Sequence, residues 1–530
     1  MKKLSAIVLI LMIFSSVYSQ DVKKTPLPAW KTKNYERNPI DYRFLPMLTP
    51  PPGSKTIYTP AEFAPMEGVI IQVPTYSDEL EDYYAAMIKA IIAADATPYI
   101  IADSTNGFSG NDITKITSNV LNPNNIDVNN VVFLDYNYDA NWTRDYGPWD
   151  IYVDGVRAIV NHEYYDDRKD DNAINGKLAT LWNEEIFSTG LHTEGGNFMT
   201  DGLGTCWAST GVINENTKYY GWTKDEVDAV YVDYLNCSNG IHHPEPLPDE
   251  GTTHIDMFSK ILDQNTIIVS YSTTALGASA AEIAALDAAA EFYANTPKPD
   301  GGQWNIVRIP MTFGNYSSYN DTWRVQYTHT NSTIVNDHVI IPVYDRGTDE
   351  EALKIYQQLM PRHTLVGVDS NNMIIWGGSI HCTTMQLPVK TYSECGNGVV
   401  DEDEECDTYF TDGVECKDLT GFNSGLLKCK NDCTFDTTLC SETEEPDEEV
   451  TDNETTDNET TDNEITDETQ TDSDTVENPD NTQTDNEQND TSTDNETIDS
   501  ESYDEEVSLD DDQPVNPVGK KDSGCSVVVF

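Results

Sequence analysis

The chain has 530 residues, enough for two or more domains, and a formal net charge of −61 at pH 7. The acidic residues are unevenly distributed, since 31 of them lie between Ser441 and Asp512, where there is no Lys or Arg. Phosphate binding depends on clustered Lys and Arg, so this balance argues against nucleic acid and favours cationic substrates, although a merely solvated acidic surface would have the same composition.

The first residues have the pattern of a secretory signal. Two lysines precede an apolar run, Leu4–Phe14, and residues 17–19 supply the positions that signal peptidase reads, so residues 1–19 are predicted to be a signal peptide cut before Gln20. A membrane anchor is the alternative, but the run is short for a bilayer and no second apolar segment follows it. The mature protein is therefore expected to be secreted or at the cell surface, in an oxidising, extracytoplasmic compartment.

A stretch rich in proline and basic residues comes next. Residues 20–58 are predicted to be an extended lead-in, with Pro50–Gly53 closing its proline-rich part. We recognise no chemistry in this stretch.

Strands and helices then alternate from Thr59 to about Leu387. Hydrophobic periodicity predicts strands at 68–73, 99–101, 131–134, 149–153, 158–161, 266–270, 305–309, 333–335, 339–343, 365–368 and 373–375, and helices at 77–92, 177–186, 225–235, 279–294 and 349–360. Such alternation predicts one α/β domain, which we place at residues 59–393.

Beyond this domain lies a cysteine-rich segment at 394–440. Six cysteines occur within 46 residues that contain little apolar material, namely Cys395, Cys406, Cys416, Cys429, Cys433 and Cys440. A segment with so small a core needs covalent support, so a module with three disulfides is the main prediction. Zinc binding is the alternative, because Cys429 and Cys433 are close together, but no histidine lies nearby.

Residues 441–515 are predicted to be a disordered acidic linker. The repeat that begins at Thr451 cannot bury enough apolar surface to fold, and its like charges keep it extended. Weak calcium binding is the alternative to a solvated stalk. Residues 516–530 resemble the start of the C-terminal sorting tags of some bacterial surface proteins, so cell-surface attachment through this segment is a further hypothesis.

The first polar cluster that can carry chemistry lies in Trp142–Trp149. Aromatic residues flank the carboxylate of Asp145, and such walls lower the local dielectric and strengthen the attraction for a planar cation. A surface ion pair between Asp145 and Arg144 at a turn would explain the same residues.

Further clusters combine polar side chains with glycine or with a base. In Glu194–Asn197 a glycine pair lets the backbone approach closely beside polar side chains. His254 and Asp256 are two residues apart, which predicts that both leave the same face of a strand, as a base and a cation-binding carboxylate would. Polar residues satisfied within a core are the alternative. Asn331, taken alone, is expected to be structural.

The last cluster contains a single cysteine. Cys382 lies in Gly377–Thr384, after an apolar run and a glycine pair, where a nucleophile could be presented. A buried thiol or one half of a disulfide fits the spacing equally well.

The spacing of the clusters is what they have in common. The intervals between successive markers are 52, 57, 77 and 51 residues, counted along Asp145, Asn197, His254, Asn331 and Cys382. Each interval can hold one unit of strands plus a helix. A pseudo-symmetric ring of such units would point one polar cluster per unit toward a common axis.

These motifs resemble those of a known family. Trp142–Pro148, Glu194–Asn197, His254–Asp256 and Gly377–Thr384 are similar, in order, to the motif set of the guanidine-modifying (pentein) superfamily, in the branch of bacterial secreted peptidylarginine deiminases and agmatine deiminases. The resemblance covers roughly residues 59–387. It implies a five-unit α/β propeller, which agrees with the interval argument.

The resemblance also implies roles for individual residues. Cys382 would attack the guanidinium carbon, while Asp145 and Asp256 would pair with the guanidinium nitrogens. His254 would protonate the departing ammonia and then activate the water that resolves the thiouronium intermediate, and Asn331 would support the nucleophile. This hydrolysis requires no metal or other cofactor, and we expect none. Cys382 should then stay out of any disulfide.

Substrate-binding residues are expected at Trp142, Arg168, Glu194 and Asn197. The secreted peptidylarginine deiminases carry two loop arginines that hold the carboxylate of a C-terminal arginine, and here Arg168 matches one of them while Asp166 replaces the other. A strict C-terminal preference is therefore weakened. The glutamate and glycine pair is at home in agmatine deiminases, whose substrate has an amine at that end, whereas the signal peptide argues against a usually cytosolic polyamine pathway.

Three functions remain after this comparison. The first is a secreted deiminase of peptidyl or C-terminal arginine that yields citrulline and ammonia. The second is an agmatine deiminase that yields N-carbamoylputrescine, a step in putrescine biosynthesis. The third is a non-catalytic surface-binding protein, for which loss of a core catalytic residue would be the mark, and all of these residues are present.

Overall fold

The computed structural model describes residues 27–29, 48–442 and 528–529, with gaps at 106, 108–109, 319–320, 393–394, 396–399, 401–403, 408–412 and 431–432. The predicted signal peptide lies outside these residues, as do most of the lead-in, the acidic linker and the C-terminal segment. Within the described residues, no helix is both long enough and apolar enough to cross a bilayer.

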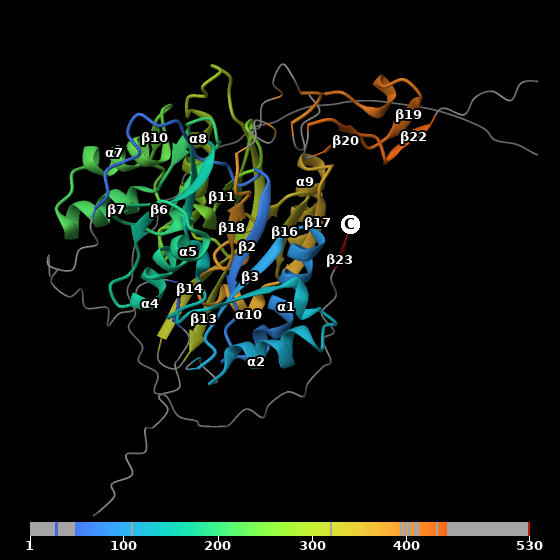
Figure 1. Cartoon of the computed structure of the whole chain (residues 1–530). Coiled ribbons are helices and arrows are strands. Elements are labelled where there is room, and N and C mark those ends of the chain that lie inside the picture. Colours follow the sequence, from blue (N-terminus) through green and yellow to red (C-terminus); the bar gives the residue numbers. More distant parts are fainter. Residues whose placement is uncertain are drawn as a thin grey trace, which may run out of the picture. The chain divides into compact units, whose positions relative to one another are not determined.

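Mixed sheets of three or four strands, with helices packed on them, make up most of the described chain (Figure 1). Their strands, in spatial order, form one sheet of β18 (Met385–Pro388), β2 (Met66–Gln72), β3 (Thr97–Ala102) and β4 (Val132–Asp135), and a second of β1 (Ile57–Tyr58), β5 (Trp149–Val153), β6 (Val156–Glu163) and β7 (Ile186–His192). A third sheet contains β10 (Ile241–His242), β9 (Cys206–Trp207) and β8 (Met199–Thr200), and a fourth contains β11 (Ser259–Ile261), β12 (Thr266–Tyr271), β13 (Asn305–Ser318) and β14 (Asp321–Thr328). The fifth contains β15 (Thr333–Val335), β16 (His338–Val343), β17 (Thr364–Asp369) and β23 (Val528–Val529). The predicted mixed α/β fold is confirmed.

Most of the described helices connect strands that lie side by side. The helices are α1 (Glu81–Ala93), α2 (Asp112–Ile116), α3 (Thr143–Tyr146), α4 (Lys169–Asn172), α5 (Ile174–Trp182), α6 (Thr210–Glu215), α7 (Lys224–Leu235), α8 (Ala280–Ala294), α9 (Asp349–Leu359) and α10 (Asn371–Ile374). Of these, α3 and α10 lie where the chain passes from one sheet to another. The longest, α8, begins with a capping box in which Ser279 and Glu282 satisfy each other's backbone N–H groups.

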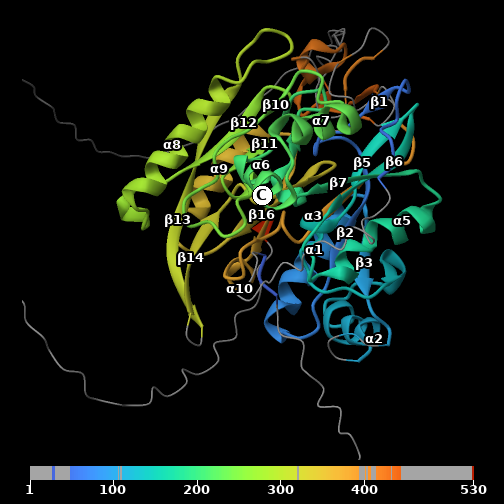
Figure 2. The same cartoon turned by 90° about the vertical axis from the view of Figure 1, so that its left-hand side faces the viewer.

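A strand, helix, parallel strand unit recurs along the chain. For example, α1 joins β2 to the parallel strand β3, and α8 joins β12 to β13, which lies beside the helix in Figure 2. Both faces of the central strands are covered, so β2 reads as a continuous apolar run in which Val69, Ile70 and Ile71 are all buried. This burial is why the strands were recognisable from the sequence.

The marker residues occupy equivalent places in this scheme. Each lies in a loop or short helix where the chain passes from one sheet to another: Asp145 before β5, Asn197 before β8, His254 before β11, Asn331 before β15 and Cys382 before β18. The regular intervals in the sequence therefore correspond to a regular position in the fold.

Two local predictions were wrong. Residues 373–375 were expected to form a strand, but Asn371–Ile374 is the short helix α10. His254 and Asp256 were expected on one face of a strand, but His254 precedes a 3-10 turn, Ile255–Met257, that contains Asp256. A single apolar run is too short to distinguish a strand from a tight helical turn.

The cysteine-rich segment contains the three disulfides that the sequence predicted, together with small two-stranded sheets. The strands are β19 (Phe422–Gly425) with β22 (Cys440–Glu442), and β20 (Lys428–Cys429) with β21 (Phe435–Asp436). The bonds are Cys395–Cys433, Cys406–Cys429 and Cys416–Cys440. Because Cys429 and Cys433 belong to different disulfides, the zinc alternative for this pair is wrong.

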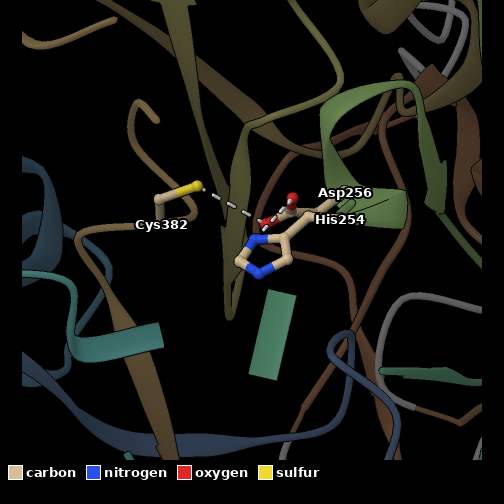
Figure 3. Close-up of side chains that lie close together, drawn as sticks. All are labelled: His254, Asp256 and Cys382. Carbon is tan, nitrogen blue, oxygen red and sulfur yellow. Dashed lines mark hydrogen bonds and ion pairs between the residues drawn. The ribbon is translucent and has the colours of Figure 1, made fainter. Parts of the chain in front are cut away.

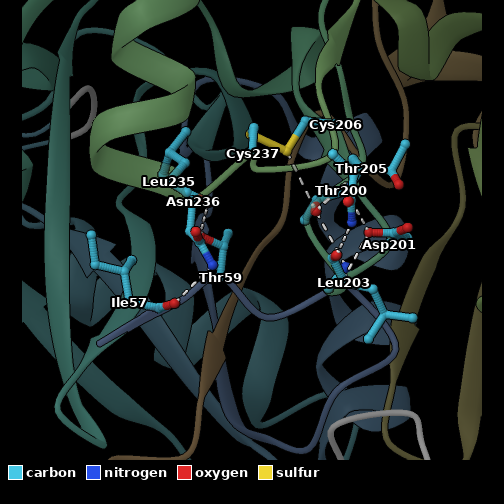
Figure 4. The surroundings of a disulfide bond; sticks show 12 residues. Ile57, Thr59, Thr200, Asp201, Leu203, Thr205, Cys206, Leu235, Asn236 and Cys237 are labelled. Carbon is cyan, nitrogen blue, oxygen red and sulfur yellow. Dashed lines mark hydrogen bonds between the residues drawn. A yellow bond between two sulfur atoms is a disulfide. The ribbon is translucent and has the colours of Figure 1, made fainter. Parts of the chain in front are cut away.

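A fourth disulfide lies in the α/β part of the chain. Cys206 in β9 is bonded to Cys237, which follows α7 (Figure 4). Nearby, the hydroxyl of Thr59 donates to the carbonyl of Leu235 at 2.6 Å. The end of α7 is thus tied both to a strand and to the start of the domain.

Candidate active site

The candidate nucleophile lies in a loop before β18, where one amide holds it. Cys382 is fully buried and is the free thiol among the described cysteines, as the sequence predicted. The Nδ2 of Asn331 donates to its Sγ at 3.2 Å, and Oδ1 of the same amide accepts from the main-chain N–H of Ser379 at 3.0 Å. Asn331 therefore fixes both the sulfur and its loop.

Asp145 reaches the same place from the short helix α3. The main-chain N–H of Arg144 donates to the carbonyl of Cys382 at 3.2 Å, so α3 docks on the nucleophile loop. Asp145 is fully buried, and neither of its carboxylate oxygens has a hydrogen-bond partner among the residues that the structure describes. Arg144 is buried too and donates to Gln386, so the alternative of a surface pair with Asp145 is wrong. A buried carboxylate in this state is costly unless a cation binds to it.

His254 lies among three carboxylates. Its Nδ1 is 3.7 Å from Oδ1 of Asp145 and 4.0 Å from Oδ1 of Asp256, while its Nε2 is 3.9 Å from Oε2 of Glu194. In Figure 3 the imidazole lies beside the Asp256 carboxylate, toward which the Cys382 sulfur points. The distance from that sulfur to Oδ2 of Asp256 is 3.7 Å. A base, a thiol and two cation-binding groups therefore share one buried space.

The titration behaviour of these groups differs. Burial, reinforced by the charges of Asp256 and Glu194, raises the pKa of Asp145 well above its usual range. Burial also acts to raise the pKa of Asp256, but the hydrogen bond and charge of His381 outweigh it and lower that pKa. Burial and the two carboxylates raise the pKa of the Cys382 thiol well above its usual range. A cation held between the carboxylates would favour both the ionised Asp145 and the thiolate.

Behind Asp256 runs a buried chain of charges that the sequence did not reveal. The Nδ1 of His381 donates to Oδ2 of Asp256 at 2.7 Å, and Nε2 of the same ring lies 3.1 Å from Oε2 of Glu62. Glu62 in turn accepts from Nζ of Lys260 at 2.6 Å. Although burial acts to raise it, Lys260 and His381 hold the pKa of Glu62 well below its usual range. His381 adjoins the nucleophile in sequence, and this position was its one signal.

The glycine pair of the second motif packs against the imidazole. A Cβ on Gly196 would lie 2.5 Å from Nδ1 of His254, so no other residue fits there without a shift. Asn197 follows in the 3-10 turn Gly195–Asn197, is buried, and has a side-chain amide without a hydrogen-bond partner in the described chain. Glu194 and Gly196 thus lie beside the candidate base, and Asn197 follows them in the same turn.

The remaining predicted binding residues, Trp142 and Arg168, are also buried. A Cβ added to Gly378 would lie 2.9 Å from Cζ3 of Trp142 and 2.7 Å from Sγ of Cys382, so both side chains pack against this glycine. Arg168 is close enough for its charge to act against the raised pKa of Asp145. The structure therefore brings every predicted site residue to one region of the molecule.

Two further buried residues position the main chain of the site. His162 donates from Nε2 to the carbonyl of Asp145 at 2.8 Å, and burial lowers the pKa of His162 to about 4. Glu250 accepts from the main-chain N–H of His254 at 3.1 Å, and burial raises the pKa of Glu250 to about 7. Neither residue lies in a recognisable motif, so sequence reasoning missed both.

Three residues of the site could hold a metal ion, and one of them also lines a cavity. His254, Asp256 and Cys382 offer ligand atoms within 4.8 Å of one another, a set that suits a soft divalent cation. A separate cavity reaches Asp256 and is also lined by Glu62, Lys260 and His381, whereas Cys382 and His254 are not among its lining residues. This cavity therefore borders Glu62, Lys260 and His381 rather than the sulfur of Cys382.

Comparisons with known proteins identify one family and several similar proteins. The model of the family described as Porphyromonas-type peptidyl-arginine deiminase matches residues 58–388, a range that includes the loops of the predicted site. A protein of Marinomonas sp. (strain MWYL1), provisionally named an agmatine deiminase, is 25% identical over 379 residues, which are 64% of this chain and 98% of that protein.

Solved structures show the same fold. A provisionally named arginine deiminase from Porphyromonas gingivalis matches with a TM-score of 0.56 and 22% identity, over 64% of this chain and all of that one. An agmatine deiminase from C. jejuni with substrate bound matches with a TM-score of 0.54 and 19% identity, over 64% of this chain and 98% of that one. The α/β part of the chain therefore has the fold of these deiminases.

Proposed function

Since the chain belongs to the Porphyromonas-type peptidyl-arginine deiminase family, we propose that it is a secreted hydrolase that deiminates peptidyl or C-terminal arginine to citrulline and ammonia. One observation carries this proposal: Cys382, His254 and the two carboxylates of Asp145 and Asp256 meet in one buried space. A guanidinium is a planar cation with several N–H donors, and the oxygens of Asp145 are buried acceptors without a partner in the described chain.

The first half of the reaction forms a covalent intermediate. Asp145 and Asp256 hold the guanidinium, and the bound positive charge lowers the pKa of the Cys382 thiol, which burial and the two carboxylates raise. The thiol proton passes to His254, the thiolate attacks the guanidinium carbon, and a C–S bond forms. The C–N bond to one terminal nitrogen then breaks, and His254 supplies the proton with which that nitrogen leaves as ammonia.

The second half releases the product. Water enters the place of the ammonia and gives a proton to His254, and its oxygen attacks the thiouronium carbon. The C–S bond breaks, the carbon retains the new oxygen as a ureido group whose hydroxyl proton passes to solvent, and the thiolate of Cys382 regains its proton from His254. Over the whole cycle one water is consumed, and one ammonia and one proton are released, while the protein returns to its initial state.

Agmatine deimination is the second candidate function. Glu194 is buried and its carboxylate lies 3.9 Å from Nε2 of His254, which would suit a substrate with a second positive charge. Several similar proteins carry the provisional name agmatine deiminase. The product would then be N-carbamoylputrescine.

A parallel assay separates these candidates. Release of ammonia and formation of ureido product are measured with agmatine, free arginine and peptides bearing internal or C-terminal arginine. Turnover of the peptides, with agmatine slower by tenfold or more in kcat/KM, is the expected result. The Cys382→Ala variant is the control. The deiminase proposal fails if the wild type turns over none of these substrates or if the alanine variant stays active.

We also propose the five-unit propeller and the secreted location. The equivalent places of the five marker residues, each where the chain passes from one sheet to another, support the propeller. Disulfides in both the α/β part and the cysteine-rich segment support an oxidising compartment for residues 20 onward. We likewise propose that the propeller domain covers residues 59–393 and that the cysteine-rich module covers residues 394–440.

A further inference from the structure

Three residues of the lead-in, Leu27–Ala29, lie against residues of the candidate site. The Nε1 of Trp142 donates to the carbonyl of Leu27 at 2.9 Å. Arg168 donates from Nη2 to the carbonyl of Pro28 at 2.6 Å, and the hydroxyl of Tyr165 donates to the carbonyl of Ala29 at 3.0 Å. All three consecutive carbonyls of this segment are therefore bound by side chains. We call Leu27–Ala29 the strap.

The strap also contacts the nucleophile loop. The main-chain N–H of Ala29 donates to the carbonyl of Trp376, which immediately precedes Gly377–Thr384, and the Ala29 side chain is completely buried. The strap therefore connects three separate segments, which carry Asp145, Arg168 and Cys382. A segment held only for stability would not need to touch each of them.

The contacts are of a kind that a peptide substrate could also make. Trp142, Tyr165 and Arg168 recognise main-chain carbonyls, which every peptide offers whatever its sequence. The nucleophile has no exposed surface, and it does not line the cavity described above. Trp142, Tyr165 and Arg168, which bind the strap, are likewise buried. Substrate must displace something to reach the sulfur.

We propose that Trp142, Tyr165 and Arg168 form a subsite for polypeptide main chain, and that the chain's own strap occupies it and competes with peptide substrates. The competitive effect on catalysis rests on the proposed deiminase function, whereas binding of the strap does not. The partner is thus a stretch of peptide main chain, supplied within the molecule by Leu27–Ala29.

The test expels the strap without altering the subsite. Ala29→Glu places a charge in a buried position, and Ala284→Glu makes the same change at an exposed position of α8 as a matched control. For Ala29→Glu we expect a KM for an arginine peptide lower by about tenfold or more, as loss of several competing hydrogen bonds predicts, and a kcat within about twofold of the wild type. A chain that begins at Trp30 replaces Ala29→Glu if that variant does not fold.

A synthetic peptide of residues 24–31 provides the second arm. It should inhibit Ala29→Glu competitively and should inhibit the wild type at least about tenfold more weakly, because the tethered strap already fills the subsite. Calorimetry with the Ala29→Glu, Cys382→Ala protein should show binding of this peptide even if no substrate is ever turned over. An unchanged KM, a lower kcat at unchanged KM, or absence of calorimetric binding would each overturn the proposal.

Discussion

The side-chain amide of Asn331 donates to the sulfur of Cys382 at 3.2 Å and is the side chain whose hydrogen bond opposes the raised pKa of that thiol. Its carbonyl oxygen meanwhile accepts from Ser379 in the nucleophile loop. One amide thus stabilises the thiolate and fixes the loop that presents it. A hydrogen bond to a charged acceptor is worth more than one to a neutral acceptor.

Replacement of Asn331 by alanine should therefore reduce activity through the thiolate. We expect kcat/KM to fall by about 10- to 100-fold, as loss of a hydrogen bond to a charged group predicts, and the pH at which iodoacetamide alkylates Cys382 to rise. Asn372→Ala, at an exposed position of α10, is the control. If alkylation keeps its pH dependence while activity falls, the amide acts on the loop alone.

The sequence allowed the fold class and the reacting residues to be predicted, but not what holds them. The reacting residues could be recognised because each combines a reactive side chain with an unusual local motif, as Asp145, His254 and Cys382 do. The regular spacing of these motifs indicated that the residues meet. Glu62 and Glu250 carry no such signal, since a buried glutamate is indistinguishable in sequence from a solvated one. Their contacts join segments far apart in the chain, and only the folded structure brings these together.

A bound guanidinium should activate the thiol. Without it, burial and the charges of Asp256 and Asp145 keep the pKa of Cys382 above its usual range, so alkylation by iodoacetamide should be slow at neutral pH and should speed up as pH rises. A guanidinium compound bound between the carboxylates should shift ionisation of the thiol to lower pH. Since that compound covers the sulfur, the ultraviolet absorbance of the thiolate measures this shift. Asp145→Asn should produce a shift in the same direction without ligand. If the thiol ionises at the same pH in the free wild type, in the guanidinium-bound wild type and in Asp145→Asn, the electrostatic account is contradicted.

His381 should act on catalysis through Asp256. Its hydrogen bond lowers the pKa of Asp256, so the carboxylate stays ionised to lower pH, and loss of that bond should move the acidic limb of the kcat/KM profile upward. His381→Gln cannot reproduce the Nδ1 donor, whereas His381→Asn can, so the glutamine variant should show the larger shift. If kcat/KM falls equally in both variants and the acidic limb of its pH profile does not move, the role of His381 is purely structural.

The pH dependence of stability should contain a contribution from Glu250. Burial raises its pKa to about 7 in the folded chain, so its contribution is fully present below the ordinary value of 4.5 and is lost as pH rises through about 7. Glu250→Gln should remove up to about 3 kcal/mol of the difference in unfolding free energy between pH 4.5 and pH 8. Urea unfolding at the two pH values measures this, with the exposed Glu245→Gln as the matched control. A pH dependence equal to that of the wild type would show that Glu250 does not titrate in this range.

The disulfide between Cys206 and Cys237 should stabilise the α/β part of the chain independently of catalysis. It closes a loop with a sequence separation of 31 residues, for which restriction of the unfolded chain predicts about 3 to 4 kcal/mol. The double variant Cys206→Ala, Cys237→Ala should therefore unfold at a lower urea concentration. Its kcat at a temperature well below unfolding should stay within about twofold of the wild type, because the nucleophile is a separate, free thiol. A large loss of kcat in a protein that remains folded would instead show that the tie between β9 and the end of α7 positions the active site.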